Sequence, residues 1–249
     1  MTLTLRRRHW LGVGVGAAAV LAAGTAYAQN ISIDFGGSGT LTERAVQLVA
    51  LITILSLAPS ILVMVTSFTR IVVVLSLLRS AIGLQSAPPN TVMISLALFL
   101  TAFIMAPTFQ AAYDQGIQPL VNQSIEAPEA LQRASAPFHD FMIKHVREKD
   151  LALFVDLSRS PAPEKPEDLS MRILIPAFMI SELRRAFEIG FLLYLPFIII
   201  DLVVASVLMS MGMMMLPPVV ISLPFKLIFF VLVDGWSLIA GSLVESFGR

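Results

Sequence analysis

The sequence predicts an all-α, membrane-associated fold, in which helical hairpins of kinked apolar helices flank an acidic extracytoplasmic insertion. Composition is the first reason. Of the 249 residues, 56% are hydrophobic and 14% are charged, with a mean hydropathy of +0.81, whereas a soluble domain contains about 25% charged residues. The second reason is that apolar residues gather in stretches long enough to enter a bilayer, which takes about 20 residues per helix. Prolines interrupt these stretches, and proline kinks or breaks helices.

Residues 1–28 have the features of a secretory signal peptide. A basic start, Arg6-Arg7-Arg8, precedes an apolar run from Trp10 to about Ala23, and Ala26-Tyr27-Ala28 fits the small-x-small cleavage rule. The apolar run is short for a membrane span, which needs about 20 residues. Cleavage would place the new N-terminus outside the cytoplasmic membrane, at the start of a flexible polar lead over residues 29–44. We therefore expect a protein of the bacterial envelope.

The first predicted hairpin covers residues 45–112. It opens with a long apolar stretch from Ala45 to Leu78, which Pro59 should break or kink. A turn rich in glycine, serine and proline follows, from Gly83 to Asn90, and a second apolar helix runs from about Thr91 to Ala112. The two apolar segments and the turn predict one helical hairpin.

An acidic insertion, residues 113–172, separates the two hairpins. From Tyr113 to Met171 it carries ten acidic and six basic residues, and helical spacing of apolar residues predicts a short amphipathic helix around Phe138–Val146. The second hairpin, residues 173–249, contains apolar helices from about Ile173 to Leu208 and from Val219 to about Val244. The insertion is too small for an independent catalytic domain.

Charge predicts the orientation in the membrane. The region of the first turn carries Arg70 and Arg79 and no acid, whereas the insertion is acidic. Because basic loops stay in the cytoplasm, we expect an inner-membrane protein whose insertion lies on the periplasmic side. A cleaved signal peptide requires the same orientation.

Charged residues inside the apolar segments need an explanation, since each costs at least about 2.5–3.5 kcal/mol at the centre of a bilayer. One interpretation is an ion or proton pathway; the other, which we favour, is pairing between neighbouring helices or subunits. Spacing predicts local pairs of Glu182 with Arg185 and of Arg184 with Glu188. Asp201 and Lys226 have no local partner, so we expect each to find one across a helix interface. The other charges within apolar segments are Arg70, Arg79 and Asp234.

A run of methionines interrupts the last apolar region just before Pro217 and Pro218. It consists of Met209, Met211, Met213, Met214 and Met215. Methionine is unbranched and polarisable and packs against many partners, so this run is either a deformable constriction or an apolar loop with no further role. Spacing alone leaves both interpretations open.

Several kinds of chemistry find no support in the sequence. The absence of cysteine excludes disulfides and thiolate metal sites. His139 and His145 are poorly spaced for a shared metal on one helix, and we expect both to be solvated. Motifs for a nucleophile elbow, a metalloprotease or a phosphate-binding loop are missing. We predict no enzyme, no cofactor and, without a basic tract, no nucleic-acid partner.

Three stretches of the sequence are similar to one protein family. The first runs from Met64 to Gly83 and is followed by Pro88-Pro89-Asn90, the second runs from Ile175 to Asp201, and the third from Met209 to Trp236. In this order and spacing they resemble the FliP family, the export-gate proteins of flagellar type III secretion, whose counterparts in injectisomes form the SctR branch. One departure is Ser86, where the family pattern has a glutamine. The signal peptide and the sizeable insertion resemble the flagellar branch.

The resemblance implies a non-enzymatic subunit of a protein-export gate. In the family, several copies (a pentamer) assemble with FliQ-type and FliR-type subunits, beside other membrane proteins of the export apparatus. Unfolded flagellar proteins pass through the centre of the assembly, much of which is lifted out of the bilayer plane. The methionine run corresponds to a gasket that closes this path. Phe187 and the arginine–glutamate cluster beside it are candidates for packing between copies.

Rival interpretations make different demands on the sequence. A small-solute or ion transporter of the inner membrane would use Asp201 and Lys226 as a coupling pair and would need substrate-binding polar groups near the midplane. A structural scaffold of the basal body would need the methionines only as filler. An intramembrane protease would need a nucleophile or an acid pair, and the sequence offers no recognisable one.

Overall fold

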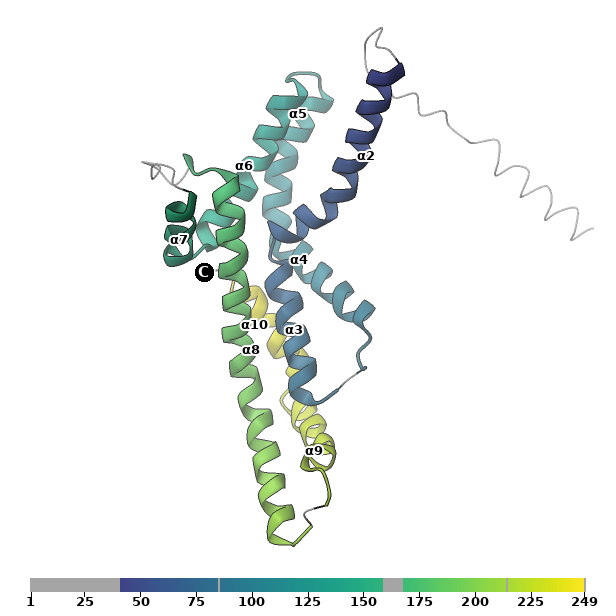
Figure 1. The fold of residues 1–249 in the computed structure, drawn as a ribbon, viewed down its shortest axis with the longest axis vertical. Helices are drawn as coiled ribbons and strands as arrows, with labels where there is room; N and C mark the ends of the chain where they lie inside the picture. Colours follow the sequence, from purple (N-terminus) through teal and green to yellow (C-terminus); the bar gives the residue numbers. More distant parts are fainter. Residues whose placement is uncertain (1–40, 85, 159–167, 214, 249) are drawn as a thin grey trace, which may run out of the picture. The chain divides into compact units, whose positions relative to one another are not determined.

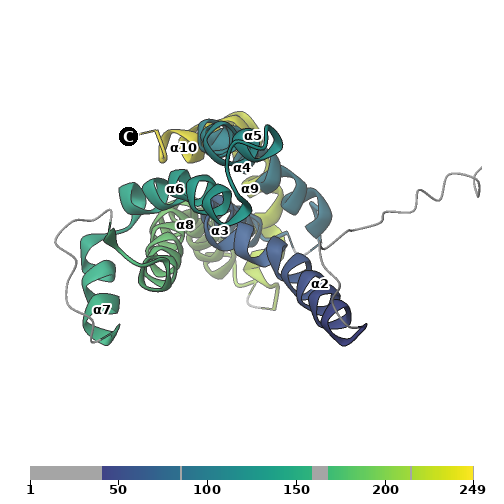
Figure 2. The same ribbon diagram turned by 90° about the horizontal axis from the view of Figure 1, so that it is seen from above.

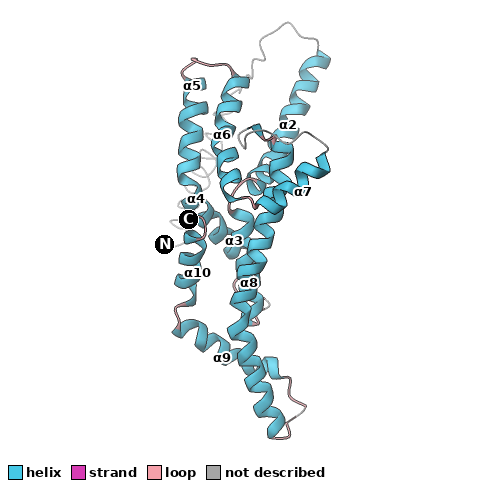
Figure 3. Ribbon diagram, turned by 90° about the vertical axis from the view of Figure 1, so that its left-hand side faces the viewer, coloured by secondary structure: helices cyan, strands magenta, loops and turns pink. Residues whose placement is uncertain are grey.

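The computed structural model describes residues 41–84, 86–158, 168–213 and 215–248. Every regular element in these ranges is a helix (Figure 3), which confirms the all-α class. Two helices are long and apolar enough to cross a membrane, Asn90–Val121 and Met171–Ser210, and a bent pair of helices makes a third candidate. The predicted signal peptide and the first part of the polar lead lie outside the described residues.

The chain divides into two units, residues 1–54 and 55–249. Helix α2 (Leu41–Met64) begins in the first unit and ends in the second. Pro59, where a break or a kink is predicted, lies inside α2, and the helix itself ends at Met64. Helix α3 starts at Phe68, whose amide donates to Thr66 Oγ1 over 3.4 Å. Hydroxyl groups that bond to nearby backbone compete with helical hydrogen bonds, which accounts for a break at this position.

Helix α3 (Phe68–Ile82) is the central element of the second unit. Ile71, Val74, Leu75 and Leu78 are buried, and their spacing places them on one helical face. This face packs into a core with residues of α4 (Asn90–Ala112), α8 (Met171–Ser210), α9 (Pro218–Leu232) and α10 (Gly235–Glu245). In Figure 1, α3 and α8 lie side by side. The helix ends at Gly83, whose φ of +92° is a left-handed conformation that glycine adopts readily.

The second apolar helix extends beyond the predicted end at Ala112. Helix α4 passes directly into a π-helical turn, η1 (Tyr113–Ile117), and then into α5 (Gln118–Val121), so that one helical run covers residues 90–121. Pro107 lies inside this run. Helical structure therefore continues without a break into the acidic insertion.

The rest of the insertion folds back on this run. Helix α6 (Ala127–His145) contains the predicted amphipathic helix and is longer than expected, and helix α7 (Glu148–Ser158) follows it. Met142 of α6 and Leu174 and Phe178 of α8 form a second, smaller core. Both α6 and α7 pack against α8, as the view along the unit in Figure 2 shows. The insertion is thereby attached to the first half of α8.

The second hairpin is asymmetric. Its first arm is α8, a continuous helix of 40 residues with Pro176 and Pro196 inside it. Its second arm, predicted as one helix, is broken into α9 and α10, which meet at an angle of 62° (Figure 3). The break falls at Asp234, a non-glycine residue with a φ of +49°. Such a left-handed residue cannot continue a right-handed helix.

Candidate functional site

The methionine-rich loop, residues 209–217, joins α8 to α9. Helix α8 closes with hydrogen bonds from the amides of Gly212 and Met213 to the carbonyls of Met209 and Leu208. Gly212 has a φ of +76°, as expected for the glycine that caps a helix. Helix α9 then starts at Pro218, a position where proline loses no helical hydrogen bond. Glycine and proline thus fix both ends of a short loop.

Four methionines of this loop have described side chains, and all four are exposed in the isolated chain. Their exposed fractions run from 44% for Met213 to 98% for Met215, with Met209 and Met211 between them. Met214 lies outside the described residues. Exposed methionines on a short, capped loop are available to a partner.

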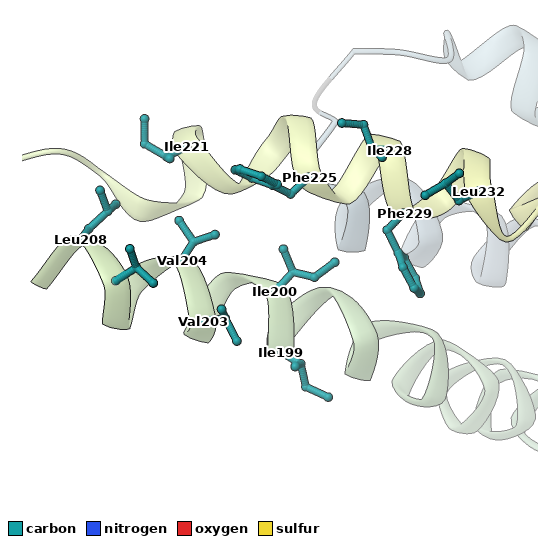
Figure 4. A pocket seen from close by; sticks show the side chains of 11 residues that line it. Ile199, Ile200, Val203, Val204, Leu208, Ile221, Phe225, Ile228, Phe229 and Leu232 are labelled. Atoms are coloured by element: carbon teal, nitrogen blue, oxygen red, sulfur yellow. The ribbon is translucent and has the colours of Figure 1, made fainter. Parts of the chain in front are cut away.

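An apolar groove extends along the same hairpin, between α8 and α9 (Figure 4). Its volume is about 610 Å³. In Figure 4, Val204 and Ile200 on α8 and Phe225 and Phe229 on α9 lie in the space between the two helices. An exposed groove lined only by aliphatic and aromatic side chains is typical of a surface that contacts lipid or another protein.

Asp201 and Lys226 form an ion pair that joins the two arms. Lys226 Nζ donates to Asp201 Oδ2 over 2.7 Å and to the Ala81 carbonyl of α3 over 3.3 Å. Ser222 Oγ donates to the other carboxylate oxygen of Asp201. Each residue therefore finds a partner on another helix, as the sequence predicts. The bonds fix α9 against both α8 and α3, close to the start of the methionine-rich loop.

Arg70 and Glu182 form the most deeply buried ion pair, with exposed fractions of 1% and 0%. Arg70 Nε donates to Glu182 Oε2 over 2.8 Å, and Nη2 donates to Oε1, so the contact is bidentate. Arg70 Nη1 also donates to Ser246 Oγ over 3.0 Å, and its guanidinium lies 3.6 Å from the centre of the Phe247 ring. This network connects α3, α8 and the residues after α10. The pair predicted between Glu182 and Arg185 is not formed, because Glu182 binds Arg70 instead.

The other charged candidates have separate surroundings. Arg184 Nε lies 3.1 Å from Glu188 Oε1, as the spacing predicts. Arg79 Nη1 donates to Asn90 Oδ1 and to the Pro88 carbonyl, across the first turn. Arg185 is half-buried, whereas Phe187 is exposed and free to contact another molecule. Asp234 is exposed at the start of α10, without a side-chain capping bond.

A polar network that the sequence does not predict attaches the insertion to α8. The Arg147 amide donates to Ser181 Oγ over 3.1 Å, and Ser181 Oγ donates to Asp150 Oδ2 over 2.8 Å. Arg147 Nη1 also lies 3.6 Å from Glu188 Oε1. The many charged residues of the insertion predict a polar segment. They do not predict this network, because only the fold brings Asp150 next to Ser181.

The prediction that both histidines are solvated is wrong. His145 is buried with an exposed fraction of 4%, and His139 is partly buried, with Nε2 2.8 Å from the Leu169 carbonyl. The two rings are buried by different contacts: His145 packs against Phe141 and Phe247, and His139 lies against Leu169, which belongs to the second core. In the part of the chain that is described, no three histidine, aspartate or glutamate side chains gather as a metal site would require.

Comparison with known proteins assigns these features to a family. The family described as "FliP family" matches residues 51–243. A flagellar biosynthetic protein FliP of Caulobacter vibrioides is 63% identical over 246 residues, covering 98% of this chain and 92% of the relative. Proteins of the same name from Bacillus subtilis and Aquifex aeolicus are 56% and 50% identical, over 82% and 92% of this chain and 93% and 96% of theirs.

Proposed function

The chain belongs to the FliP family, and on that premise we propose that it is a core subunit of the flagellar type III protein-export gate. Its relatives are flagellar biosynthetic proteins, so it is a membrane component of the flagellar export apparatus, in a family of structural proteins and not of enzymes. In the proposed gate, copies of the chain assemble into a pentamer with FliQ-type and FliR-type subunits. Unfolded flagellar proteins pass through the centre of this assembly.

The observation that carries the proposal is the exposed methionine-rich loop. Its thioether side chains lie at the turn between α8 and α9, where copies arranged around an axis could bring their loops together. Methionine side chains re-pack easily, so a ring of them would seal against ions and yet part for a chain of any sequence. A hydrophobic constriction also hinders ions by excluding water.

The surfaces of the chain support an assembly of several subunits. The α8–α9 groove is apolar along its length, and Phe187 is exposed beside the Arg184–Glu188 pair. Large exposed apolar patches mark sites of contact with proteins or membranes. We assign the groove and Phe187 to contacts with neighbouring copies or with the FliQ-type and FliR-type subunits.

The proposed arrangement in the membrane follows the charge distribution. A signal peptide, residues 1–28, and a flexible lead, residues 29–44, precede two helical hairpins, residues 45–112 and 173–249. The insertion, residues 113–172, lies on the periplasmic side of the inner membrane, because it is acidic and the first turn is basic.

The alternative function, a small-solute or ion transporter, finds less support. It would use Asp201 and Lys226 as a coupling pair. These two side chains bind each other, Ser222 and the Ala81 carbonyl. These hydrogen bonds account for Asp201 and Lys226 as structural contacts between helices. A transport role would require the contacts to break.

Protein export in living cells tests the proposal. A strain lacking the gene is complemented with the intact gene or with a variant in which Met209, Met211, Met213, Met214 and Met215 are all changed to alanine. We expect no hook or filament protein in the medium without the gene. We expect the alanine variant to lower the membrane potential, measured with a voltage-sensitive dye, because the shorter side chains cannot close the path.

Met64→Ala is the matched control, since Met64 is also an exposed methionine but lies on α2. It should leave the membrane potential unchanged. Normal export in the deletion strain would overturn the export function. Loss of export in the deletion strain with no ion leak in the alanine variant would leave a structural subunit and reject the methionine seal.

A further inference from the structure

The three described residues after α10, which we call the α10 tail, are held by helices from distant parts of the sequence. They are Ser246, Phe247 and Gly248. Arg70 of α3 donates to Ser246 and lies over the Phe247 ring. From α6, Phe141 stacks on Phe247 with ring centres 6.0 Å apart, and the His145 ring lies 5.4 Å from it. The tail is thus fixed between α3 and the insertion.

His145 contacts a carbonyl oxygen with each of its ring nitrogens. Nδ1 lies 2.7 Å from the Phe141 carbonyl, and Nε2 lies 3.3 Å from the Phe247 carbonyl. A carbonyl oxygen only accepts hydrogen bonds, and a neutral imidazole has a single N–H group. Only the protonated ring donates to both carbonyls. In the neutral ring, the lone pair of one nitrogen would face the lone pairs of an oxygen.

His145 also lies between two helix ends. His145 is the last residue of α6, and the Phe247 carbonyl lies just beyond the end of α10. Free carbonyl groups give a helix C-terminus partial negative charge, which attracts cations. Two such ends converge on one buried imidazole.

The other charged side chains around His145 largely compensate one another. Arg70 is neutralised by Glu182, and Asp140 and Lys144 line one small cavity together with His145. The charged residues flanking these contacts are Arg70 on α3, Asp140 and Lys144 on α6, Arg147 directly after α6, Glu182 on α8 and Glu245 on α10, and the same helices carry further charges, among them Arg184, Arg185 and Glu188 on α8.

We propose that His145 is a proton-controlled latch, which in its protonated form holds the α10 tail against α6 and on deprotonation gives up the bond to the Phe247 carbonyl. Histidine is the side chain that changes charge between pH 5 and 8. Because α10 follows directly on α9, the latch fixes the distal end of the hairpin arm that starts at the methionine-rich loop. The proposal concerns the attachment of this arm and holds whether or not the loop forms a seal.

A single nitroxide label on the α10 tail tests the latch. The chain has no cysteine, so Gly248→Cys provides a unique attachment site in the full-length protein, purified in detergent. Gly248 is exposed, and a Cβ there would meet no atom nearer than 3.7 Å. Electron paramagnetic resonance spectra at pH 5.5 and pH 8 then report the mobile fraction of the label. We expect the ratio of mobile to immobile label to rise roughly threefold to tenfold at pH 8, as for the loss of one hydrogen bond.

Two histidine variants of the labelled protein identify the titrating group. His145→Gln should give the same spectrum at both pH values, because glutamine does not titrate. His139→Gln is the matched control: it lies on the same helix, but only its Nε2 contacts a carbonyl, and it should keep the pH response. An unchanged spectrum of the labelled parent between pH 5.5 and 8 would overturn the latch without any histidine variant. A pH response that persists in His145→Gln would overturn it as well.

Discussion

Single charged side chains hold the helices of this protein together at defined points. Arg70, Glu182 and Lys226 are nearly inaccessible to solvent, and each has an oppositely charged partner on another helix. A buried charge is strongly unfavourable unless it is paired and hydrogen-bonded. Each pair therefore adds little net stability when intact, but it specifies which helix faces meet. Removal of one partner leaves the other charge buried without a counter-ion, which lowers the free energy of unfolding.

Glu182→Gln should destabilise the protein strongly. The change leaves the Arg70 guanidinium buried without its counter-ion, and breaking a buried ion pair on one side costs about 3–5 kcal/mol. The measurement is the free energy of unfolding of the purified protein in detergent, followed by tryptophan fluorescence during denaturation.

Glu129→Gln is the control for this prediction. Glu129 pairs with Arg133 on the exposed face of α6, with half of each side chain accessible, and such surface pairs contribute about 0.3–0.5 kcal/mol. Equal losses for the two variants would contradict the structural role assigned to the Arg70–Glu182 pair. The double variant Arg70→Met with Glu182→Leu should recover much of the loss, since neither charge is left alone.

The sequence indicates which charges need partners but not what those partners are. Arg70 is the only charged residue between Ala45 and Leu78, so the need for a partner was predictable. The identity of the partner was not, because Glu182 lies 112 residues away. The Arg184–Glu188 contact was predictable because one helix supplies both residues. The burial of His145 could not be predicted from the sequence. It depends on the packing of α6 against α8 and the α10 tail, which no local pattern of residues indicates.

Within the insertion, two helical elements, η1 and α6, pack unusually closely. The π-helical turn η1 lies against α6 at Gly116. A π-turn holds one extra residue and often marks a functional position; here it occurs where the apolar run of α4 enters the acidic insertion. A Cβ added at Gly116 would lie 2.6 Å from the Ala130 carbonyl oxygen and 2.6 Å from Ala134 Cβ. Glycine is therefore required for the two helices to approach.

Gly116→Ala should separate α6 from η1 and destabilise the insertion by about 1–3 kcal/mol, the usual range for an overpacked contact. The obstructing atoms belong to the backbone and to Cβ, so no side-chain rotation relieves the clash. Hydrogen exchange of the α6 amides, measured by mass spectrometry, should become faster in this variant than in the parent.

Gly241→Ala serves as the comparison for the glycine change. Gly241 is also helical, but a Cβ there would meet nothing within 4 Å. Alanine is favoured over glycine inside a helix by about 1 kcal/mol, so this variant should be neutral or slightly stabilised. Unchanged exchange in α6 of the Gly116→Ala protein would refute the close-packing explanation.

At the scale of the whole molecule, α8 is too long to be a simple membrane span. Its 40 residues correspond to about 60 Å at 1.5 Å per residue, twice the roughly 30 Å of a bilayer's hydrocarbon core. Its first half packs against the insertion and its second half against α9. Composition predicts a membrane helix here. The sequence alone does not show that one half of α8 packs against the insertion and the other against α9, because apolar residues suit both a protein core and a bilayer.

The proposed orientation is testable with two cysteine variants in intact cells. Asp156→Cys places a thiol on α7 in the insertion, and Ser86→Cys places one in the turn between α3 and α4, where both parent residues are exposed. With a membrane-impermeant maleimide added from the periplasmic side, residue 156 should be labelled and residue 86 should not. Permeabilised cells, in which both should react, provide the control. The reverse labelling pattern would place the insertion in the cytoplasm.

The separation of Arg70 from Glu182 also has a consequence for biosynthesis. A ribosome adds about 5–20 residues per second, so Glu182 is synthesised roughly 6 to 20 s after Arg70, given the 112 residues between them. Lys226 follows Asp201 by only 25 residues, a delay of roughly 1 to 5 s at the same rate. Until the first turns of α8 emerge, α3 carries an arginine without its counter-ion, and the cost of burying that charge favours keeping α3 in water or at the insertion machinery.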